Sequence, residues 1–481
     1  MTSPWDFLLH QARLDPSALA ILRPARRVTF GQLLVLVKRV ARQLRRRGVQ
    51  PGQVVVNSVQ DKALNWIVTL ALFHEAAIGC SHGASKAWTA GFGYGWLVVD
   101  GKGPVPAGDN VIAIEHRRDG DEVIEPRRFA DNAAVARISF TSGTTGRPRG
   151  VPHTLAQLLH WSAIDVALPG AAGALSLIGH DTAADFRASY SSLIAGKPVI
   201  VVATHKEALA LIEQGHVRVV YASPPAVSAL MDEMAASSAS VPPLQCVRLA
   251  GAGTPRPLLA RIERQLARTI FNDYGSTETG RLCACRLASS RPERVAGYRV
   301  PDAELEIVDA DGRPLPTGEV GLVRARTPFM ATAYLEEPQA SAVAFREGWF
   351  HSGDLGVLRP DGLLVLAGRE SEVINVGGVK VDPVMIDQAI LEFPGVHDAA
   401  VFAVPSSASD AVVAAVVADE EADLEALTQA LRARLSRSVI PGAYVRLEEI
   451  PRNAMGKPMR AQMRQQFVDG RIRKAKMGPS Q

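Results

Sequence analysis

Segments with helical periodicity alternate with short Val- and Ile-rich runs through most of this chain of 481 residues. Residues 30–48 space their apolar side chains along one helix face, which predicts a helix. Residues 53–56 follow a Pro-Gly turn and residues 217–222 end just before two prolines, which predicts two short strands. Such alternation is typical of layered α/β folds and argues against all-α and all-β folds.

The pattern changes twice along the chain. After about Val300, turn signals such as Asp311-Gly312 separate short strands, which predicts a β-rich subdomain. After Gly368, helix candidates at 383–392 and 423–435 alternate with strands, as in a small α+β domain.

The length of 481 residues exceeds what one hydrophobic core supports. We therefore expect an N-terminal core over residues 1–368, built of layered βαβ subdomains plus the β-rich subdomain. A small C-terminal α+β domain would occupy residues 369–481.

The composition excludes several classes of protein. A net charge of +4 gives no general case for nucleic-acid binding. Four cysteines in so long a chain argue against a disulfide framework, and the lone pair Cys283 and Cys285 makes a poor metal site. The N-terminus lacks the features of a signal peptide, and apolar runs such as 66–73 are too short to span a bilayer. We expect a cytoplasmic protein.

The segment Thr141–Gly150 (TSGTTGRPRG) has the composition of a polyphosphate-binding loop. Its glycines allow backbone N–H groups to approach a phosphate, its hydroxyls can donate hydrogen bonds, and Arg147 and Arg149 supply charge. An apolar run ending at Phe140 predicts a strand that delivers this loop at its carboxyl end. No Gly-Lys-Ser/Thr follows, so this is not a Walker loop. Gly/Ser/Thr clusters also form ordinary surface loops, so this segment alone leaves both interpretations open.

Three further motifs follow in order: NDYGSTETG at Asn272–Gly280, HSGDLG at His351–Gly356 and NAMGK at Asn453–Lys457. Together with the loop they resemble the adenylate-forming superfamily, which comprises acyl- and aryl-CoA synthetases, the adenylation domains of nonribosomal peptide synthetases, and beetle luciferases. The resemblance extends from RRVTFGQL at residues 26–33 to the final lysine motif.

The resemblance implies a role for each motif in binding ATP and Mg²⁺. Tyr274 would stack on adenine, Thr277 would bind the α-phosphate, and Glu278 would help to hold Mg²⁺, which prefers carboxylate oxygen. The implied ATP- and AMP-binding residues are Thr141, Ser142, Gly143, Thr144, Thr145, Gly146, Arg149, Gly251, Ala252, Asp273, Tyr274, Gly275, Asp354 and Arg369. Of these, Asp354 is expected in a tight Gly-Asp turn, where it would accept both ribose hydroxyls, with Arg369 beside it.

By the same resemblance the C-terminal domain is mobile and carries the catalytic residue Lys457, which together with Thr277 and Glu278 would form the catalytic set. Its ammonium would bridge the attacking carboxylate and the α-phosphate. Gly377 and Gly378 would line a tunnel for the thiol, although they also read as a simple turn.

Two positions depart from the family pattern. Arg149 stands where a lysine is common, which keeps the charge and changes the geometry. Ser371 stands at the hinge where Asp or Lys is common, so the rate of domain rotation is not predicted by the family pattern.

The acid-binding pocket is less clearly encoded. Amino-acid-activating relatives place an Asp where this chain has Ala183, so an α-ammonium would be buried without a partner; a shifted alignment to Asp181 or Asp185 would reopen this possibility. The residues expected near the acyl pocket are His180, Phe186, Tyr190 and Gly253, although core packing explains Phe186 and Tyr190 equally well.

We therefore expect an enzyme that activates an aromatic or medium-chain carboxylic acid, and not an α-amino acid, to an acyl-adenylate. A thiol then displaces AMP, most simply coenzyme A. The alternatives are the phosphopantetheine arm of an acyl carrier protein, which the basic segment 471–476 could meet, or a nitrogen nucleophile. An alternative of another class is a non-catalytic nucleotide-binding homologue.

Overall fold

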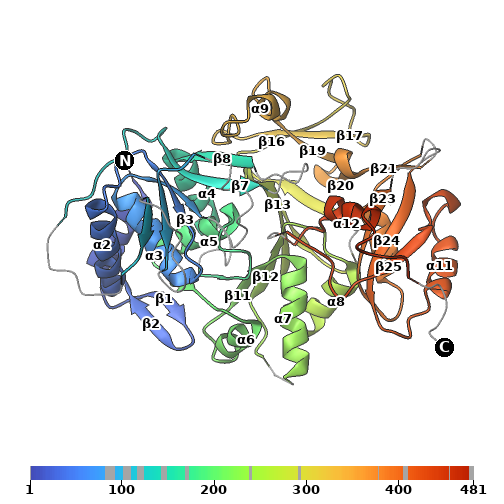
Figure 1. Cartoon of the computed structure of the whole chain (residues 1–481), viewed down its shortest axis with the longest axis horizontal. Coiled ribbons are helices and arrows are strands. Elements are labelled where there is room, and N and C mark those ends of the chain that lie inside the picture. Colours follow the sequence, from blue (N-terminus) through green and yellow to red (C-terminus); the bar gives the residue numbers. More distant parts are fainter. Residues whose placement is uncertain are drawn as a thin grey trace.

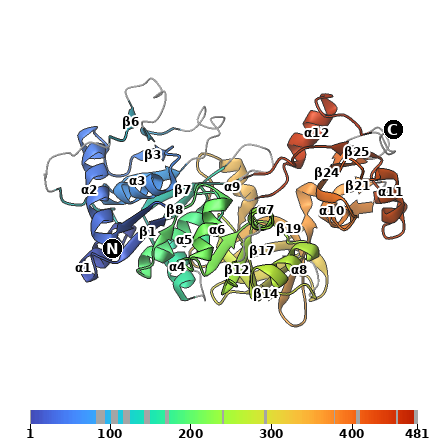
Figure 2. The same cartoon turned by 90° about the horizontal axis from the view of Figure 1, so that it is seen from below.

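The computed structural model describes residues 2–81, 93–100, 110–115, 124–141, 149–167, 173–237, 241–290, 294–376, 379–404, 410–453 and 456–475. A large N-terminal domain carries a small C-terminal domain at one end of an elongated molecule. Figure 2 shows α10, α11 and β24 of the small domain at the end opposite α1 and α2. Among the described residues, no helix is both long and apolar enough to cross a membrane.

A six-stranded sheet lies in the N-terminal part of the large domain (Figure 1). Its pairs are parallel except for β7 and β8, which run antiparallel. In sheet order its strands are β6 (Val111–Ala113), β5 (Trp96–Val99), β3 (Val54–Asn57), β4 (Ile78–Ser81), β7 (Val135–Thr141) and β8 (Arg149–Thr154).

Among the described residues, a second sheet of fourteen strands runs through the rest of the large domain. One path through it joins β16 (Glu304–Val308), β17 (Val320–Arg326), β19 (Trp349–Leu358), β20 (Leu363–Arg369), β15 (Val295–Arg299), β14 (Gly280–Leu287), β13 (Ile270–Ser276), β12 (Cys246–Ala250), β11 (Val219–Ala222), β9 (Leu175–Ser176), β10 (Val199–Ile200), β1 (Leu19–Arg23) and β2 (Arg26–Thr29). The remaining strand, β18 (Phe345–Arg346), pairs with β19.

This sheet changes from parallel to antiparallel pairing at β13. β11, β12 and β13 are parallel neighbours, whereas β13 and β14 form an antiparallel pair. The β-rich segment predicted after Val300 therefore continues the α/β sheet instead of forming a separate one. The change of pairing comes earlier than the turn signals indicated, because the hairpin turn at 277–279 already reverses the chain.

Helices cover these sheets, and their starts follow the capping residues in the sequence. Thr29 and Gln32 form a capping box at α2, and Asp61 and Thr182 accept backbone hydrogen bonds at the starts of α3 and α5. The helices of the large domain are α1 (Pro4–Leu14), α2 (Phe30–Arg46), α3 (Lys62–His74), α4 (Leu155–Ala167), α5 (Ala183–Ile194), α6 (His205–Glu213), α7 (Pro224–Ala236), α8 (Arg256–Gln265) and α9 (Pro338–Ala344).

The small domain has a hydrophobic core of its own, formed by side chains such as Ile386, Ile390 and Leu427. Its elements are η2 (Glu370–Glu372), β21 (Ile374–Val376), β22 (Val379–Val381), α10 (Pro383–Leu391), β23 (Val396–Val404), β24 (Ala411–Ala418), α11 (Leu424–Arg432), η3 (Arg437–Val439), β25 (Ala443–Arg446) and α12 (Arg460–Val468). The helices predicted at 383–392 and 423–435 are confirmed with slightly shorter bounds. The expected α/β fold with a large and a small domain is thus present.

Candidate active site

The motif Asn272–Gly280 crosses from β13 into β14 through a turn at residues 277–279. A Cβ atom on Gly275 would lie 2.0 Å from the backbone oxygen of Gly280, so no other residue fits there without moving the backbone. This close approach presents Thr277, half-buried, and Glu278, only 5% exposed, on one tight hairpin turn.

Asp354 joins two other predicted nucleotide ligands. Its Oδ2 accepts a hydrogen bond from the hydroxyl of Tyr274 at 2.7 Å, and its Oδ1 accepts one from Nε of Arg369 at 3.0 Å. The expectation of a tight Gly-Asp turn is wrong, because Asp354 lies within strand β19, where it pairs in register with Arg369 of β20. The adjacent Gly353 has a φ of 72°, a bulge-like conformation that favours glycine.

Glu278 has a partner that the sequence did not reveal. Its Oε1 accepts a hydrogen bond from the hydroxyl of Tyr334 at 2.7 Å, and its backbone oxygen accepts one from the N–H of Ala331 at 2.7 Å. Burial, followed by the negative charge of Glu278, raises the pKa of Tyr334, so Tyr334 stays a hydrogen-bond donor. Tyr334 lies in the loop before α9, and no local motif distinguishes it.

The flanks of the predicted phosphate loop form neighbouring strand ends. Thr141 at the end of β7 is paired in register with Arg149 at the start of β8, so the strand expected before the loop is present. The guanidinium of Arg149 lies over the ring of Tyr334, 5.3 Å from its centroid. Ser142, Gly143, Thr144, Thr145 and Gly146 lie outside the described residues.

The C-terminal domain brings Lys457 to these groups. Lys457 is half-buried, and its ammonium interacts electrostatically with Arg369, Asp354, Glu372 and Glu278. Burial, followed by the positive charge of Arg369, lowers the pKa of Lys457, while the three carboxylates oppose this effect. Charged groups from four separated motifs therefore lie within electrostatic range of Lys457.

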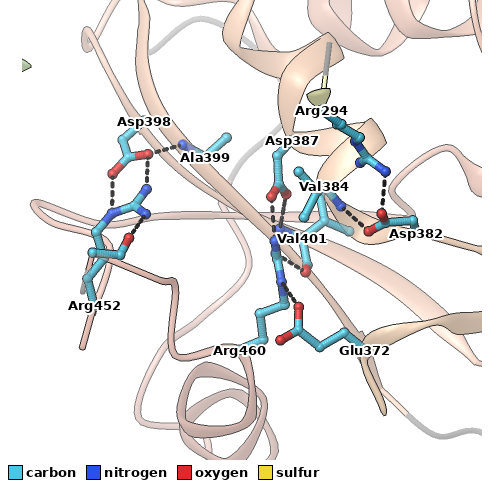
Figure 3. A network of polar contacts seen from close by, with 11 residues as sticks. Arg294, Glu372, Asp382, Val384, Asp387, Asp398, Ala399, Val401, Arg452 and Arg460 are labelled. Atoms are coloured by element: carbon cyan, nitrogen blue, oxygen red, sulfur yellow. Dashed lines mark hydrogen bonds and ion pairs between the residues drawn. The ribbon is translucent and has the colours of Figure 1, made fainter. Parts of the chain in front are cut away.

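Two described residues just before Lys457, Arg452 and Gly456, are held by contacts to their surroundings. Arg452 donates to the backbone oxygen of Gly456 at 2.7 Å and to Asp398 of β23 at 2.6 Å (Figure 3). Gly456 has a φ of 76°, and a Cβ atom there would lie 3.0 Å from Oγ of Ser223, at the start of α7 in the large domain. The glycine thus permits close contact between the two domains next to Lys457.

An ion pair joins the two domains, and others hold the small domain together next to the junction (Figure 3). Arg294, before β15, forms an ion pair with Asp382, the capping residue of α10. Arg460, on α12, pairs with Asp387 at 2.5 Å and lies 3.6 Å from Glu372 of η2. Ser371, the predicted hinge residue, is exposed in the middle of η2. Gly377 and Gly378 lie outside the described residues.

Of the predicted acyl-pocket residues, Phe186 and Tyr190 belong to the hydrophobic core of the large domain. Tyr190 is only 1% exposed and packs edge-on against Phe7, because both side chains lie between α1 and α5. Phe186 stacks on Phe73 and also lines a small cavity.

The remaining predicted residues of this region lie at strand and helix ends. His180 is half-buried just before α5, and its Nε2 has no hydrogen-bond partner among the described residues. Gly251 and Ala252 follow β12 and are half-buried, whereas Gly253 is exposed. Asp273 is buried within β13 and is held by Arg248.

Comparison with known proteins agrees with this arrangement. The model of the AMP-binding enzyme family matches residues 97–335, and the model of the AMP-binding enzyme C-terminal domain matches residues 385–457. The chain therefore belongs to the AMP-binding enzyme family. The predictions of this family, of its fold and of an AMP-forming ligase are confirmed.

Similar proteins include both curated sequences and solved structures. A 2-succinylbenzoate–CoA ligase of Geobacillus kaustophilus is 29% identical over 495 residues, which cover 96% of this chain and 98% of that protein. O-succinylbenzoate coenzyme A synthetase of Bacillus subtilis, solved in complex with AMP, has a TM-score of 0.84 and 24% identity, with 99% of each chain covered. The amide bond synthetase of Marinactinospora thermotolerans has a TM-score of 0.79 and 23% identity, covering 96% of this chain and 99% of its own.

Proposed function

We propose that this enzyme converts an aromatic carboxylic acid and Mg·ATP into an acyl-adenylate and pyrophosphate, and then transfers the acyl group to coenzyme A. The observation that supports the proposal is the hydrogen-bonded cluster of Tyr274, Asp354 and Arg369. Lys457, on a separate domain, lies within electrostatic range of Asp354, Arg369 and Glu278, which suits a lysine that acts on a bound nucleotide.

In the first step a carboxylate oxygen of the acid attacks the α-phosphorus of ATP, and the bond to the pyrophosphate oxygen breaks. The enzyme forms no covalent intermediate, so its contribution is positioning and stabilisation of charge. The ammonium of Lys457 would lie between the carboxylate and the α-phosphate and balance the negative charge that gathers there. Thr277 would donate a hydrogen bond to the α-phosphate from the adjacent turn.

The nucleotide would be held by residues that the fold already brings together. Tyr274 would stack on adenine, while Asp354, anchored by Tyr274 and Arg369, would accept the ribose hydroxyls. Asp273, Gly275, Gly251 and Ala252 would shape the adenine side of the site. The loop from Thr141 to Arg149 would enclose the phosphates.

Glu278 suits a magnesium ion that also contacts the phosphates. Oε1 is engaged by Tyr334, so Glu278 would offer Oε2, and one carboxylate together with substrate phosphates is a common magnesium environment. When bound, Mg²⁺ would neutralise phosphate charge and make pyrophosphate a better leaving group.

In the second step the thiol sulfur attacks the acyl carbon, and the bond to AMP breaks. We place the domain boundary at 368/369, with Ser371 beside the hinge, and rotation there would replace the Lys457 loop by Gly377 and Gly378. An acyl carrier protein remains a second acceptor, since Arg471 and Arg473 are basic and could meet an acidic partner. A cytoplasmic location would give access to ATP and coenzyme A.

A panel of carboxylic acids, scored by acid-dependent ATP–pyrophosphate exchange, tests the first step. 2-Succinylbenzoate belongs in the panel because it gives the similar ligases their names. Products formed with coenzyme A, a carrier protein or an amine, identified by mass spectrometry, then assign the acceptor. ATP binding without exchange for any acid would instead support a non-catalytic nucleotide-binding protein.

A further inference from the structure

Five charged side chains are buried beside the candidate nucleotide site and form what we call the buried arginine network. Each is at most 9% exposed, although charged residues are seldom so deeply buried. They come from α4, α5, β12, β13 and β14, and are Asp165, Arg187, Arg248, Asp273 and Arg281.

The contacts in this network are short and continuous. Asp273 accepts two hydrogen bonds from Arg248, at 2.6 and 3.0 Å, and also pairs with Arg281 at 3.0 Å. Arg281 donates to Asp165 at 2.7 Å. Asp165 pairs at 2.7 Å with Nε of Arg187, which ends the chain of contacts.

The charges in this network do not balance. Within the described residues, three guanidinium groups share two carboxylates, which leaves one positive charge in excess. A buried charge without a counterion is strongly unfavourable. Tyr221 lies within electrostatic reach of the network, but burial raises its pKa, so it does not supply a negative charge near neutral pH.

Arg187 is the member of the network with capacity for another anion. Among the described residues its one ion-pair partner is Asp165, and that contact uses Nε. The two terminal nitrogens of a guanidinium form the fork that binds a carboxylate with two parallel hydrogen bonds.

The network lies where the acid is expected to bind. Asp273 directly precedes Tyr274 and is paired in register with Ala250, which precedes Gly251. Arg187 lies on α5, the helix that begins just after His180 and packs through Ala184 and Ala188 near Tyr221 and Ala250. The excess positive charge therefore lies between the adenine side of the site and the predicted acyl pocket.

A small cavity beside Arg187 is lined by polar groups that lack partners. Within the described residues, Oγ of Ser139, Oγ of Ser162 and both ring nitrogens of His153 are buried without a hydrogen bond. Burial, followed by the charge of Arg137, lowers the pKa of His153 to about 3, so its ring is neutral and adds no counter-charge. The cavity measures about 10 Å³, close to the space for one water molecule, so a larger group has to widen it.

A fourth buried guanidinium strengthens the positive potential of this region. Arg137 is 2% exposed and lies over the ring of Phe186, 4.4 Å from the centroid. The nearby carboxylate of Asp185 is already paired with Lys62 at 2.7 Å. Arg137 is therefore a further buried cation close to the predicted acyl pocket, within electrostatic range of Asp185 and Asp181.

We infer that the acid substrate carries a second anionic group, most simply a second carboxylate, which pairs with Arg187 and neutralises the buried arginine network. This inference rests on the acid-activating function proposed above, and it names the class of acid. The first carboxylate reacts with ATP near Lys457, and the second is recognised at the α5 end of the pocket.

Matched acids test the inference on the wild-type enzyme. 2-Succinylbenzoate carries two carboxylates, and each of its two monoamides retains one while keeping almost the same shape. We expect kcat/KM for ATP–pyrophosphate exchange to be at least about tenfold higher with the diacid than with the better monoamide, since an unpaired buried charge is costly. Equal values for diacid and monoamide would overturn the inference.

Variants of Arg187 identify the residue responsible. Arg187→Gln removes the charge and should reduce the ratio of diacid to monoamide activity about tenfold, while Arg187→Lys should preserve part of it. The matched control is Arg261→Gln, which removes an arginine that pairs with Asp232 on the surface and should leave the ratio unchanged. A ratio unaffected by Arg187→Gln would contradict the role of Arg187; if that variant does not fold, the wild-type comparison decides.

Calorimetric titration separates this inference from the proposed function. If no acid supports exchange, the proposed function fails, but binding of the diacid and its monoamides to the wild-type protein can still be compared. Tighter binding of the diacid by about tenfold would support the inference, and equal Kd values would overturn it.

Discussion

Arg149 lies over the aromatic ring of Tyr334, with the guanidinium carbon 5.3 Å from the ring centroid. The hydroxyl of the same tyrosine donates a hydrogen bond to Glu278 at 2.7 Å. Arg149 is therefore linked through Tyr334 to the candidate magnesium ligand. A planar guanidinium stacks on an aromatic ring better than an ammonium does, which gives a structural reason for arginine at this position.

Tyr334→Phe should weaken the use of magnesium. The change removes one hydrogen bond to a buried carboxylate, and bonds to charged groups typically contribute about 1.5–3 kcal/mol. We expect kcat/KM for Mg·ATP in exchange to fall about tenfold or more, with a higher magnesium requirement. Tyr298→Phe, at a tyrosine 42% exposed on β15, is the control. A normal magnesium titration in Tyr334→Phe would show that the hydroxyl has no such role.

Arg149→Lys should have a smaller effect of the same kind. The charge near the phosphates is preserved, whereas the stacking on Tyr334 is weakened, which corresponds to about 0.5–2 kcal/mol. We expect a loss of about twofold to thirtyfold in kcat/KM for Mg·ATP. The double variant Arg149→Lys/Tyr334→Phe should lose less transition-state stabilisation free energy than the two single variants lose together, because both changes act through one contact. Additive losses would indicate that Arg149 acts independently.

Lys457→Ala should separate the two chemical steps. Removing a donor that stabilises transition-state charge typically costs about 10²–10³ in rate, so acid-dependent exchange should fall by at least that factor. Thiolysis of a supplied acyl-adenylate should continue, because Lys457 would have left the site by then. Lys206→Ala, on the exposed surface of α6, is the control. Equal loss of both steps would contradict the exchange of the Lys457 loop for Gly377 and Gly378.

The pH dependence of exchange should reflect the lowered pKa of Lys457. Burial and the charge of Arg369 favour the neutral amine, so the ammonium loses its proton at a lower pH than a free lysine, whose pKa is about 10.4. The charged form is present below this lowered pKa and is lost as the pH rises through it. We therefore expect kcat/KM for exchange to decline on the alkaline side before about pH 10.4.

Lys457→Arg provides the test of that assignment. A guanidinium stays charged throughout the accessible pH range, so the alkaline decline should disappear even if the overall rate is lower. An unchanged alkaline limb would assign the titration to another group.

The motif at Asn272–Gly280 groups Tyr274, Thr277 and Glu278 because they are close along the chain. The hairpin turn that holds them, which Gly275 permits, was not predicted from the sequence. The fold class followed from alternating periodicities. The Gly-Asp pair is a turn signal, so the sequence predicts a turn at Asp354. In the structure Asp354 instead pairs with Arg369 of β20 and lies within a strand.

Long-range neighbours could not be predicted from these motifs. Tyr334 reaches Glu278 across 56 positions of the chain, and Arg281 meets Asp165 across 116, so only the packing of loops and helices against the sheet brings them together. Tyr190 was ambiguous for a related reason, because an aromatic residue on α5 could line a pocket or pack in the core. In the structure it packs in the core, against Phe7 of α1. Charge balance likewise becomes visible only when buried partners can be counted.

Arg460→Met should destabilise the small domain while leaving the large one folded. Arg460 pairs with Asp387 at 2.5 Å and donates to the backbone oxygen of Val401 at 2.6 Å, and both charged side chains are at most 9% exposed (Figure 3). Removing one partner leaves the carboxylate buried and unpaired, which typically costs about 3–5 kcal/mol. Burial already raises the pKa of Asp387, so the variant should regain stability as the pH falls and this carboxyl becomes neutral.

Hydrogen exchange suits this variant because it reports on each segment separately. Tryptophan fluorescence would report only on the large domain, since all six tryptophans lie before residue 369. Protection should fall in α10, β23 and α12 while it is retained in β11 and β12. Arg460→Met combined with Asp387→Asn removes the unpaired charge and should recover part of the protection, whereas Arg434→Met, at an exposed ion pair with Glu392, should change little. Uniform loss of protection in both domains would mean that the small domain does not unfold independently, and would count against a boundary at 368/369.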